Sequence, residues 1–210
     1  KQIPNLLFYG NSGVGKTTVA KCLVNQINSD YMVINASLQG NIDTLRNDIS
    51  SFASTVSLTN NDVKKYVILD EADYLTQNTQ PALRNFMEEY SSNCGFILTC
   101  NIPERIIPAL KSRLSQFEFN FSTNKTSLAK EMFSKIVHIL ENENISYDKN
   151  SVVEILRRNY PDLRKTINEI QKISYTNGEI NLKYEVSEDV DIEKLIVFLP
   201  VALSVTLATL

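Results

Sequence analysis

A glycine-rich stretch near the start of the chain, Gly10–Thr17, has the residue types needed to hold a chain of phosphates. Its sequence, GNSGVGKT, matches the pattern G-x-x-x-x-G-K-[ST] and stands between an apolar run and a helical pattern. Glycines let the backbone turn tightly, so that N–H groups surround phosphate at the start of a helix. Lys16 would supply positive charge to the β- and γ-phosphates, and the Thr17 hydroxyl would bind Mg²⁺. The predicted contacts to ATP are Gly10, Asn11, Ser12, Gly13, Val14, Gly15, Lys16, Thr17 and Thr18.

A second candidate group is the acidic pair Asp70-Glu71, which directly follows the apolar run Tyr66–Leu69. An acid at the C-terminal end of a strand beside a phosphate-binding loop is placed to organise Mg²⁺. We expect Asp70 to hold the metal's coordination shell and Glu71 to orient and polarise the attacking water. The next two residues, Ala72 and Asp73, are interpreted as a solvated acidic turn.

Three polar residues later in the chain are further candidates, because the two motifs above suggest a function for each. Asn101 ends the run ILTCN, and its amide would hold the lytic water and sense the γ-phosphate if that strand adjoins Tyr66–Leu69. Arg113 in LKSRL has two open interpretations, a surface arginine or a cation that acts on phosphate. Arg164 in YPDLRKT begins a predicted helix, where a positive charge is slightly unfavourable, and this hints at a ligand role.

The elements that must position these residues alternate between apolar runs and helical patterns. Continuous apolar strands that alternate with helices predict an α/β fold, a five-stranded parallel sheet flanked by helices on both faces. Such a layout is typical of nucleotide-binding proteins. The expected strands are Asn5–Tyr9, Tyr31–Asn35, Tyr66–Leu69, Gly95–Thr99 and Gln116–Phe119.

The helices between these strands are indicated by their caps and by apolar residues at spacings of three and four. One helix should run from about Gly15 to Asn28, and a second should begin after Asn41 as its N-cap. A third is expected around Pro81, because proline is tolerated in a first helical turn. The apolar faces of the second and third helices are Ile42, Leu45, Ile49 and Phe52, and Leu83, Phe86, Met87 and Tyr90.

Beyond residue 122 the pattern becomes helical, so we divide the chain into three parts. These are an ATPase core over residues 1–121, a small all-helical domain over 122–182, and a linker with an uncharged tail over 183–210. A hinge is expected near Phe121–Asn124, and helices are expected at Lys125–Asn142, Ser151–Tyr160 and Leu163–Tyr175. The uncharged end of the tail is shorter than the roughly 20 residues that cross a bilayer, so we expect no membrane span. Two interpretations stay open, the start of a further packed domain and a non-native tail.

Composition argues against several classes of protein. The net charge of −3 is unlike that of a free-standing nucleic-acid binder, so any such contact must come from local patches. The three cysteines lack C-x-x-C spacing and there is one histidine, His138, so a structural zinc site is not expected. An odd, sparse cysteine count fits a reducing, cytoplasmic setting, the host's cytoplasm if the protein is viral.

Taken together, the motifs resemble those of a known family. The stretches IPNLLFYGNSGVGKTT, LDEADYLTQNTQPALRNFMEEYSSNCGFILTCN and RIIPALKSR are similar to AAA+ clamp-loader ATPase subunits, in particular the small subunits of replication factor C. MEEYSSNC and YPDLRKTI are most similar to the tailed-bacteriophage version of that subunit. The resemblance runs from about Lys1 to Tyr175 and implies an AAA+ P-loop fold followed by a helical lid domain.

The resemblance implies a role for each candidate residue of the ATP site. Gly10–Thr17 would be Walker A and Asp70-Glu71 Walker B, with Asn101 as sensor 1 and Arg164 as sensor 2 of the lid. Ser112-Arg113 is similar to the family's Ser-Arg-Cys motif, whose arginine reaches into the ATP site of the neighbouring subunit. Leu114 stands where that motif has cysteine.

The segment QPALR is similar to the family's Q-x-A-L-R element, which lies near the DNA-facing inside of the ring. By resemblance, Gln80 and Arg84 would help to connect DNA contact to the ATP site. For Arg84 a structural role, tying helices together, is an equal alternative. Arg46, on the preceding helix, is a further candidate for phosphate contact.

The function implied by the resemblance is that of an ATP-hydrolysing motor subunit of a sliding-clamp loader. Its partners would be other subunits of a ring, a pentamer by resemblance, together with a sliding clamp and primer-template DNA. Two alternatives stay open, a non-hydrolysing scaffold subunit and another AAA+ replication ATPase. We reject an RNA helicase, which the letters D-E-A-D suggest, because the chain lacks that family's Ser-Ala-Thr element and second RecA-like domain. The 210-residue chain is expected to be a weak, monomeric ATPase on its own.

Overall fold

The computed structural model describes residues 2–39, 41–55, 64–121 and 125–182. By its contacts the chain divides into two compact units, Lys1–Asn120 and Phe121–Leu210. Residues 122–124 of the expected hinge and the expected tail over 183–210 lie outside the described residues.

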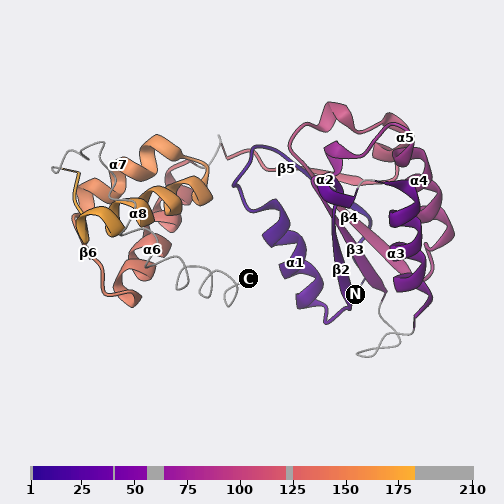
Figure 1. Ribbon diagram of the computed structural model, residues 1–210, viewed down its shortest axis with the longest axis horizontal. Coiled ribbons are helices and arrows are strands. Elements are labelled where there is room, and N and C mark those ends of the chain that lie inside the picture. Colours follow the sequence, from indigo (N-terminus) through magenta and orange to yellow (C-terminus); the bar gives the residue numbers. More distant parts are fainter. Residues whose placement is uncertain (1, 40, 56–63, 122–124, 183–210) are drawn as a thin grey trace. The chain divides into compact units, whose positions relative to one another are not determined.

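The first unit is built on a five-stranded sheet with the strand order β2-β3-β4-β1-β5 (Figure 1). Every pairing in it is parallel, and β1 lies between β4 and β5. This confirms the predicted α/β fold, and each predicted strand end lies within one residue of the observed one. The strands are β1 (Leu6–Tyr9), β2 (Tyr31–Asn35), β3 (Lys65–Asp70), β4 (Cys94–Cys100) and β5 (Ser115–Glu118).

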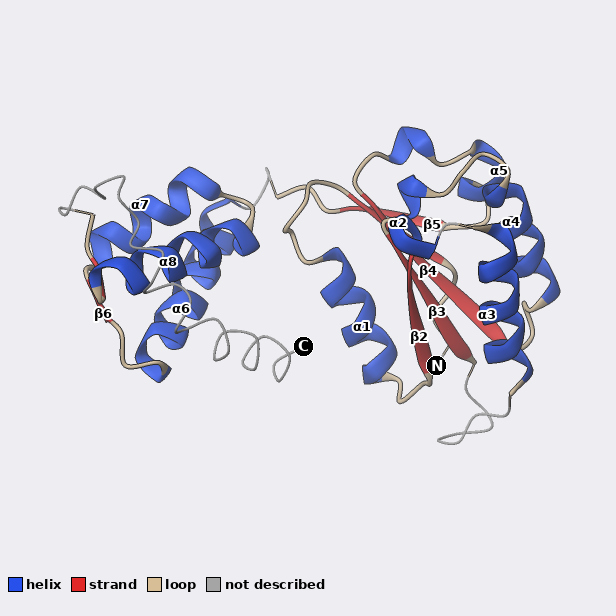
Figure 2. Cartoon of the chain, in the orientation of Figure 1, coloured by secondary structure: helices blue, strands red, loops and turns tan. Residues whose placement is uncertain are grey.

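Helices cover both faces of this sheet, as Figure 2 shows. On one face α1 (Lys16–Gln26) buries Ala20 and Val24 in a hydrophobic core with Phe8 of β1. On the other face α3 (Ile42–Ser54) and α4 (Thr79–Glu89) share a second core with Leu7. Successive residues of a strand point to opposite faces, so adjacent residues of β1 serve different cores. This explains why the central strands are apolar throughout.

Local sequence signals set the ends of the helices in this unit. The Asn41 side chain accepts a hydrogen bond from the Asp43 N–H at 3.2 Å, which confirms the predicted N-cap of α3. Pro81 lies in the first turn of α4, where an N–H has no partner within the helix. Short helical turns complete the unit: α2 (Ala36–Gln39), η1 (Ala72–Tyr74), η2 (Pro103–Arg105) and α5 (Pro108–Lys111).

The second unit is helical and consists of α6 (Lys125–Asn142), α7 (Lys149–Asn159) and α8 (Leu163–Asn177) around one hydrophobic core. Its interior includes Met132, Ile136, Val152, Ile155 and Ile170. A two-residue parallel ladder, β6 (Ser146–Tyr147) with β7 (Glu179–Ile180), adds an element that no sequence pattern indicated. Within the described ranges, no helix is both long and apolar enough to cross a membrane.

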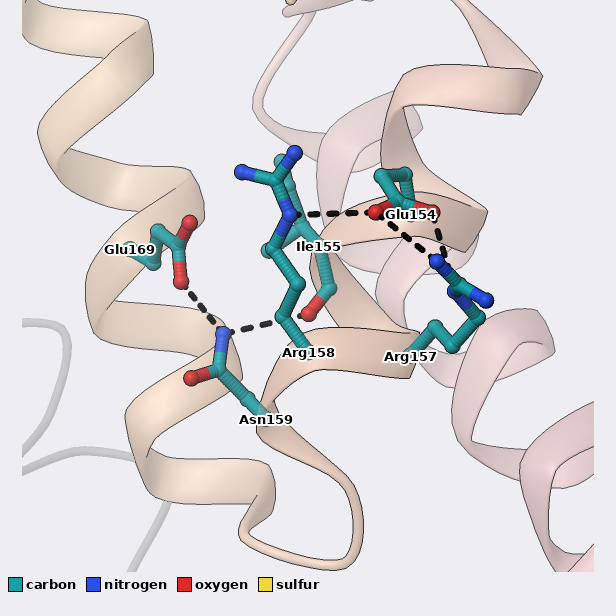
Figure 3. A network of polar contacts seen from close by, with 6 residues as sticks. All are labelled: Glu154, Ile155, Arg157, Arg158, Asn159 and Glu169. Carbon is teal, nitrogen blue, oxygen red and sulfur yellow. Dashed lines mark hydrogen bonds and ion pairs between the residues drawn. The ribbon is translucent and has the colours of Figure 1, made fainter.

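Polar contacts fasten α7 to α8, as Figure 3 shows. The buried Asn159 side chain donates to the Ile155 carbonyl at 3.1 Å and to the Glu169 carboxylate of α8. Nearby, Glu154 accepts hydrogen bonds from Arg157 and Arg158 of its own helix. The middle of α8 is thereby tied to the end of α7.

Candidate active site

The glycine loop turns tightly between β1 and α1, and its three glycines all have positive φ angles. These are 142° at Gly10, 72° at Gly13 and 89° at Gly15. A Cβ added at Gly10 would lie 2.8 Å from the Phe119 carbonyl oxygen, so that position needs glycine for space as well as for its backbone angle. At Gly15 no atom lies within 4 Å of an added Cβ, so the backbone angle alone requires glycine there.

Helix α1 begins without a side-chain cap. Gly15 occupies the N-cap position and has no side chain to accept hydrogen bonds, and the first turn contains no acidic residue. In contrast, the side chains of Asn41, Asp148 and Asp162 cap α3, α7 and α8. The N–H groups of a first turn and the helix dipole both favour a bound anion. The loop therefore fits a phosphate group.

Lys16 connects the glycine loop to the end of β4. Its side chain is almost buried, and Nζ donates to the carbonyl oxygens of Gly10 at 2.9 Å and Asn11 at 2.7 Å. Nζ also donates to the side-chain oxygen of Asn101 at 2.8 Å. These three acceptors are neutral oxygens that hold the ammonium in place. The structure thus brings together Lys16 and Asn101. It also pairs β4 with β3, the adjacency on which the prediction for Asn101 depended.

Three oxygen-bearing side chains meet where α1, β3 and β4 come together. The Thr17 hydroxyl donates to Asp70 Oδ1 at 2.6 Å, and the Thr99 hydroxyl donates to the same oxygen at 2.5 Å. Mg²⁺ prefers oxygen ligands and is often bound by one or two carboxylates together with phosphate oxygens. Thr17 and Asp70 therefore fit the predicted cation. Thr99 was missed, although a polar residue inside the apolar run of β4 was a signal that could have identified it.

Glu71 has a backbone conformation that is uncommon for a residue with a side chain. Its φ and ψ are 56° and 43°, in the left-handed region, and it precedes η1 without capping it through its side chain. Its N–H donates to the Thr99 hydroxyl at 3.3 Å. Strained backbones of this kind cost about 1–3 kcal/mol and concentrate at functional sites. Thr99 thus contacts both acidic residues, through the Asp70 carboxylate and the Glu71 backbone.

Ala72 and Asp73 are buried, which corrects the interpretation of this segment as a solvated turn. Asp73 is only 5% exposed, because the short helix η1 packs against the end of β4. Its Oδ2 accepts from the Ile102 N–H at 3.3 Å, while Oδ1 has no hydrogen-bond partner among the described residues. Burial, with a smaller contribution from Asp73, raises the pKa of the neighbouring Cys100 thiol to about 12. Asp73 therefore holds the segment that follows Asn101.

Gln80 is buried and forms hydrogen bonds only inside the protein. Its Nε2 donates to the Leu75 carbonyl at 3.2 Å and to the Arg105 carbonyl at 2.9 Å. Its Oε1 accepts from the Ile107 N–H at 2.8 Å. Gln80 therefore links the start of α4 to the segment before α5. The geometry leaves a coupling role open for it but offers no surface for direct contact with nucleic acid.

Two other candidates for nucleic-acid contact make limited contacts within the protein. Arg84 Nε lies 3.5 Å from Glu88 Oε1, one turn further along α4. The Arg46 guanidinium lies 5.7 Å from the centre of the Phe86 ring, a cation–π contact. Arg46 is exposed and Arg84 is partly exposed, so both remain accessible to a ligand in this unit.

Arg113 follows α5, and a carboxylate of α4 holds its guanidinium. Arg113 Nε donates to Glu88 Oε1 at 2.6 Å, and Nη2 forms an ion pair with the same oxygen. The next residue, Leu114, is buried in the core of the first unit, so an apolar side chain suits the place where the similar motif has cysteine. No sequence pattern indicated a role for Glu88.

The remaining predicted residues lie on accessible parts of the two units. Arg164 is exposed in the first turn of α8, in the second unit, so its approach to a nucleotide remains a prediction. The other predicted loop contacts are exposed or half-buried: Asn11, Ser12, Val14 and Thr18.

Comparisons with known families and proteins agree with this geometry. Residues 6–123 match the ATPase family associated with various cellular activities (AAA). Residues 124–181 match the family described as sliding-clamp-loader large subunit, AAA+ ATPase lid domain. Both matches confirm the resemblance inferred from the motifs.

Individual relatives support the same conclusion. The replication factor C small subunit of Methanococcus maripaludis is 37% identical over 185 residues, which are 86% of this chain and 57% of that protein. The sliding-clamp-loader large subunit of Escherichia phage RB69 is 39% identical over 178 residues, which are 82% of this chain and 55% of that protein. The chain thus spans somewhat more than half the length of these relatives.

The fold is also similar to that of a solved structure. The Thermotoga maritima RuvB Holliday junction branch migration motor superposes with a TM-score of 0.65, covering 94% of this chain and 63% of that one. At 15% identity, this similarity shows the fold alone.

Proposed function

The chain belongs to the AAA family of ATPases, and from this we propose that it is an ATP-hydrolysing motor subunit of a sliding-clamp loader. One arrangement of side chains carries the proposal. Lys16 is hydrogen-bonded to Asn101 and Thr17 is hydrogen-bonded to Asp70, beside the start of α1, which has no side-chain cap. The match of residues 124–181 to a clamp-loader lid domain favours a role in clamp loading over another AAA+ function.

In the proposed ATP complex the glycine loop holds the phosphates through its backbone N–H groups and the start of α1. Lys16 provides a fixed positive charge on the β- and γ-phosphates. Thr17 and Asp70 would hold a Mg²⁺ ion, which when bound neutralises negative charge on the phosphate oxygens. Phosphoryl transfer involves little covalent chemistry by the protein, so these positioned charges carry most of its contribution.

The attack on the γ-phosphate needs a positioned water. Glu71 orients and polarises this water, and the Asn101 amide holds it in line with the γ-phosphate. The left-handed backbone at Glu71 supports the assignment, because uncommon backbone conformations of this kind concentrate at functional sites. Arg164 of the lid supplies a further positive charge to the same nucleotide.

Hydrolysis also requires a residue from a neighbouring subunit. Arg113 acts in trans as an arginine finger, a group worth roughly 10³–10⁵ in rate in related phosphoryl-transfer systems. The proposed partners are the other subunits of a pentameric ring, a sliding clamp and primer-template DNA. Arg84 and Arg46 contact the DNA backbone, and several subunits together supply the affinity that a chain with a net charge of −3 lacks.

The test is MgATP turnover by the full-length protein with its partner subunits and clamp, with and without primer-template DNA. We expect turnover that DNA and clamp stimulate, and loss of that stimulation in Arg113→Ala and Glu71→Gln. Tight ATP binding without DNA-dependent turnover would contradict a motor and favour a scaffold subunit.

A further inference from the structure

Helix α4 carries polar residues at every fourth position along one face: Gln80, Arg84 and Glu88. Residues four apart lie above one another on a helix, so these side chains form a single stripe. At one end of the stripe Gln80 bonds to the backbone of Arg105 and Ile107, before α5. At the other end Glu88 bonds to Arg113, after α5. The stripe therefore holds the segment that contains α5 on both sides.

The contact between Glu88 and Arg113 fixes the orientation of the guanidinium plane. Nε and Nη2, which lie along one edge of that plane, share Glu88 Oε1. Nη1 donates to the Ala109 carbonyl at 3.1 Å, within the same turn of the chain. An arginine has five N–H donors in a rigid fork, so contacts at Nε and Nη1 set the direction of the remaining donors. About one third of the Arg113 side chain stays exposed.

Glu88 is in its charged form when it makes these contacts at neutral pH. The hydrogen bond from Arg113 lowers the pKa of the Glu88 carboxyl below its ordinary value, and Arg84 contributes in the same direction. Arg84 Nε lies 3.5 Å from the same oxygen that Arg113 uses. A single carboxylate oxygen of Glu88 thus lies close to two cations, Arg84 on α4 and Arg113 after α5.

We propose that Glu88 is the positioning residue for Arg113, holding the guanidinium in the direction in which it meets the ATP of the neighbouring subunit. The inference rests on the proposed function, because it assumes that Arg113 acts in trans. An unheld arginine samples many rotamers, and a misplacement of about 1 Å costs roughly 10²-fold in rate in other enzymes. In this proposal Glu88 acts through Arg113 and not on the nucleotide itself.

The test is a double-mutant cycle on DNA-stimulated ATP hydrolysis by the full-length protein in the assembled complex. Glu88→Gln removes the charge while nearly preserving the shape of the side chain. Glu89→Gln is the matched control, because Glu89 lies next to it on α4, is exposed, and its side chain forms no hydrogen bond or ion pair with another described residue. Both substitutions are also made in an Arg113→Ala background, and kcat, the KM for ATP and the thermal midpoint are measured for each variant.

We expect Glu88→Gln to lower kcat about tenfold or more, as loss of orientation does, with an unchanged KM and thermal midpoint. Glu89→Gln should leave all three unchanged. In the Arg113→Ala background Glu88→Gln should cause no further loss, because both substitutions disable the same group. Unchanged kcat in Glu88→Gln, or losses that multiply in the double variant, would overturn the proposal.

The cycle separates this inference from the function on which it rests. If Arg113→Ala lowers turnover strongly while Glu88→Gln does not, the arginine finger stands and the positioning role of Glu88 is wrong. If Arg113→Ala leaves turnover unchanged, the arginine finger is wrong, and the role of Glu88 falls with it.

Discussion

The ammonium nitrogen of Lys16 lies 2.8 Å from the side-chain oxygen of Asn101, although 85 positions of sequence separate the two residues. The contact exists because β4 adjoins β1 in a parallel sheet, so the loop after β1 and the residue after β4 meet at the same edge. It links the group that would bind the γ-phosphate to the group that would hold the attacking water.

Replacing Asn101 separates these two tasks. Asn101→Ala should leave the Kd for ATP within a few-fold of its original value, because the loop and Lys16 remain. Its kcat should fall about 10²-fold, as when one positioned hydrogen-bonding group is removed from other active sites. Nucleotide titration and single-turnover hydrolysis measure the two quantities. A Kd weakened as much as kcat would show that Asn101 serves binding rather than the chemical step.

Thr99→Val should disturb both acidic residues without changing the shape of the core. A buried hydrogen bond to a charged group contributes about 1.5–3 kcal/mol, so the free energy of unfolding should fall by about that amount. The affinity for ATP should also weaken in the presence of Mg²⁺ and stay unchanged with EDTA, because Asp70 loses a donor that orients it. Thr99→Ser keeps the hydroxyl and should behave like the unaltered protein. Equal affinities for Val and Ser variants with Mg²⁺ would refute this role.

Gln80→Leu should destabilise the protein, because it leaves the Ile107 N–H and the Arg105 carbonyl without their partner. One unsatisfied buried polar group costs about 1–3 kcal/mol, and we expect a loss of about 2 kcal/mol or more in the free energy of unfolding. Denaturant titration of the full-length protein measures it. Gln77→Leu is the control, since Gln77 is exposed and its side chain forms no hydrogen bond with other described residues. Similar losses for both variants would mean that the buried contacts of Gln80 contribute little.

Cysteine alkylation should distinguish the three thiols. Burial raises the pKa of Cys94 to about 11 and that of Cys100 to about 12, so at pH 8 both stay protonated as well as shielded. Cys22 is exposed. Iodoacetamide at pH 8 should therefore modify Cys22 alone in the native protein and all three thiols after unfolding, as read by peptide mass spectrometry. Rapid native labelling of Cys100 would show that the region around Asp73 opens readily.

The sequence was sufficient to predict those features that depend only on residues close together in the chain. The glycine loop, the Asn41 cap and the position of Pro81 in a first turn are local, because each uses the backbone within a few residues. The apolar strands were equally readable, since a strand buried on both faces must be apolar throughout. For the same reason the acidic pair could be located from the strand that precedes it.

Only the tertiary structure decided which side chains meet across the fold. Asp73 belongs to an acidic run that looks solvated, and it is buried because η1 folds against β4. Thr99 reaches Asp70 because β3 and β4 are neighbours, and Glu88 reaches Arg113 because α4 packs beside α5. Sequence by itself determined the five strands of the large sheet, the longer helices, the phosphate loop and the family, because these rest on short-range backbone geometry and contiguous motifs. The partners of Asp70, Arg113 and Gln80 depend on which strand ends and helix faces come together, and that is set by long-range packing, which no local pattern encodes.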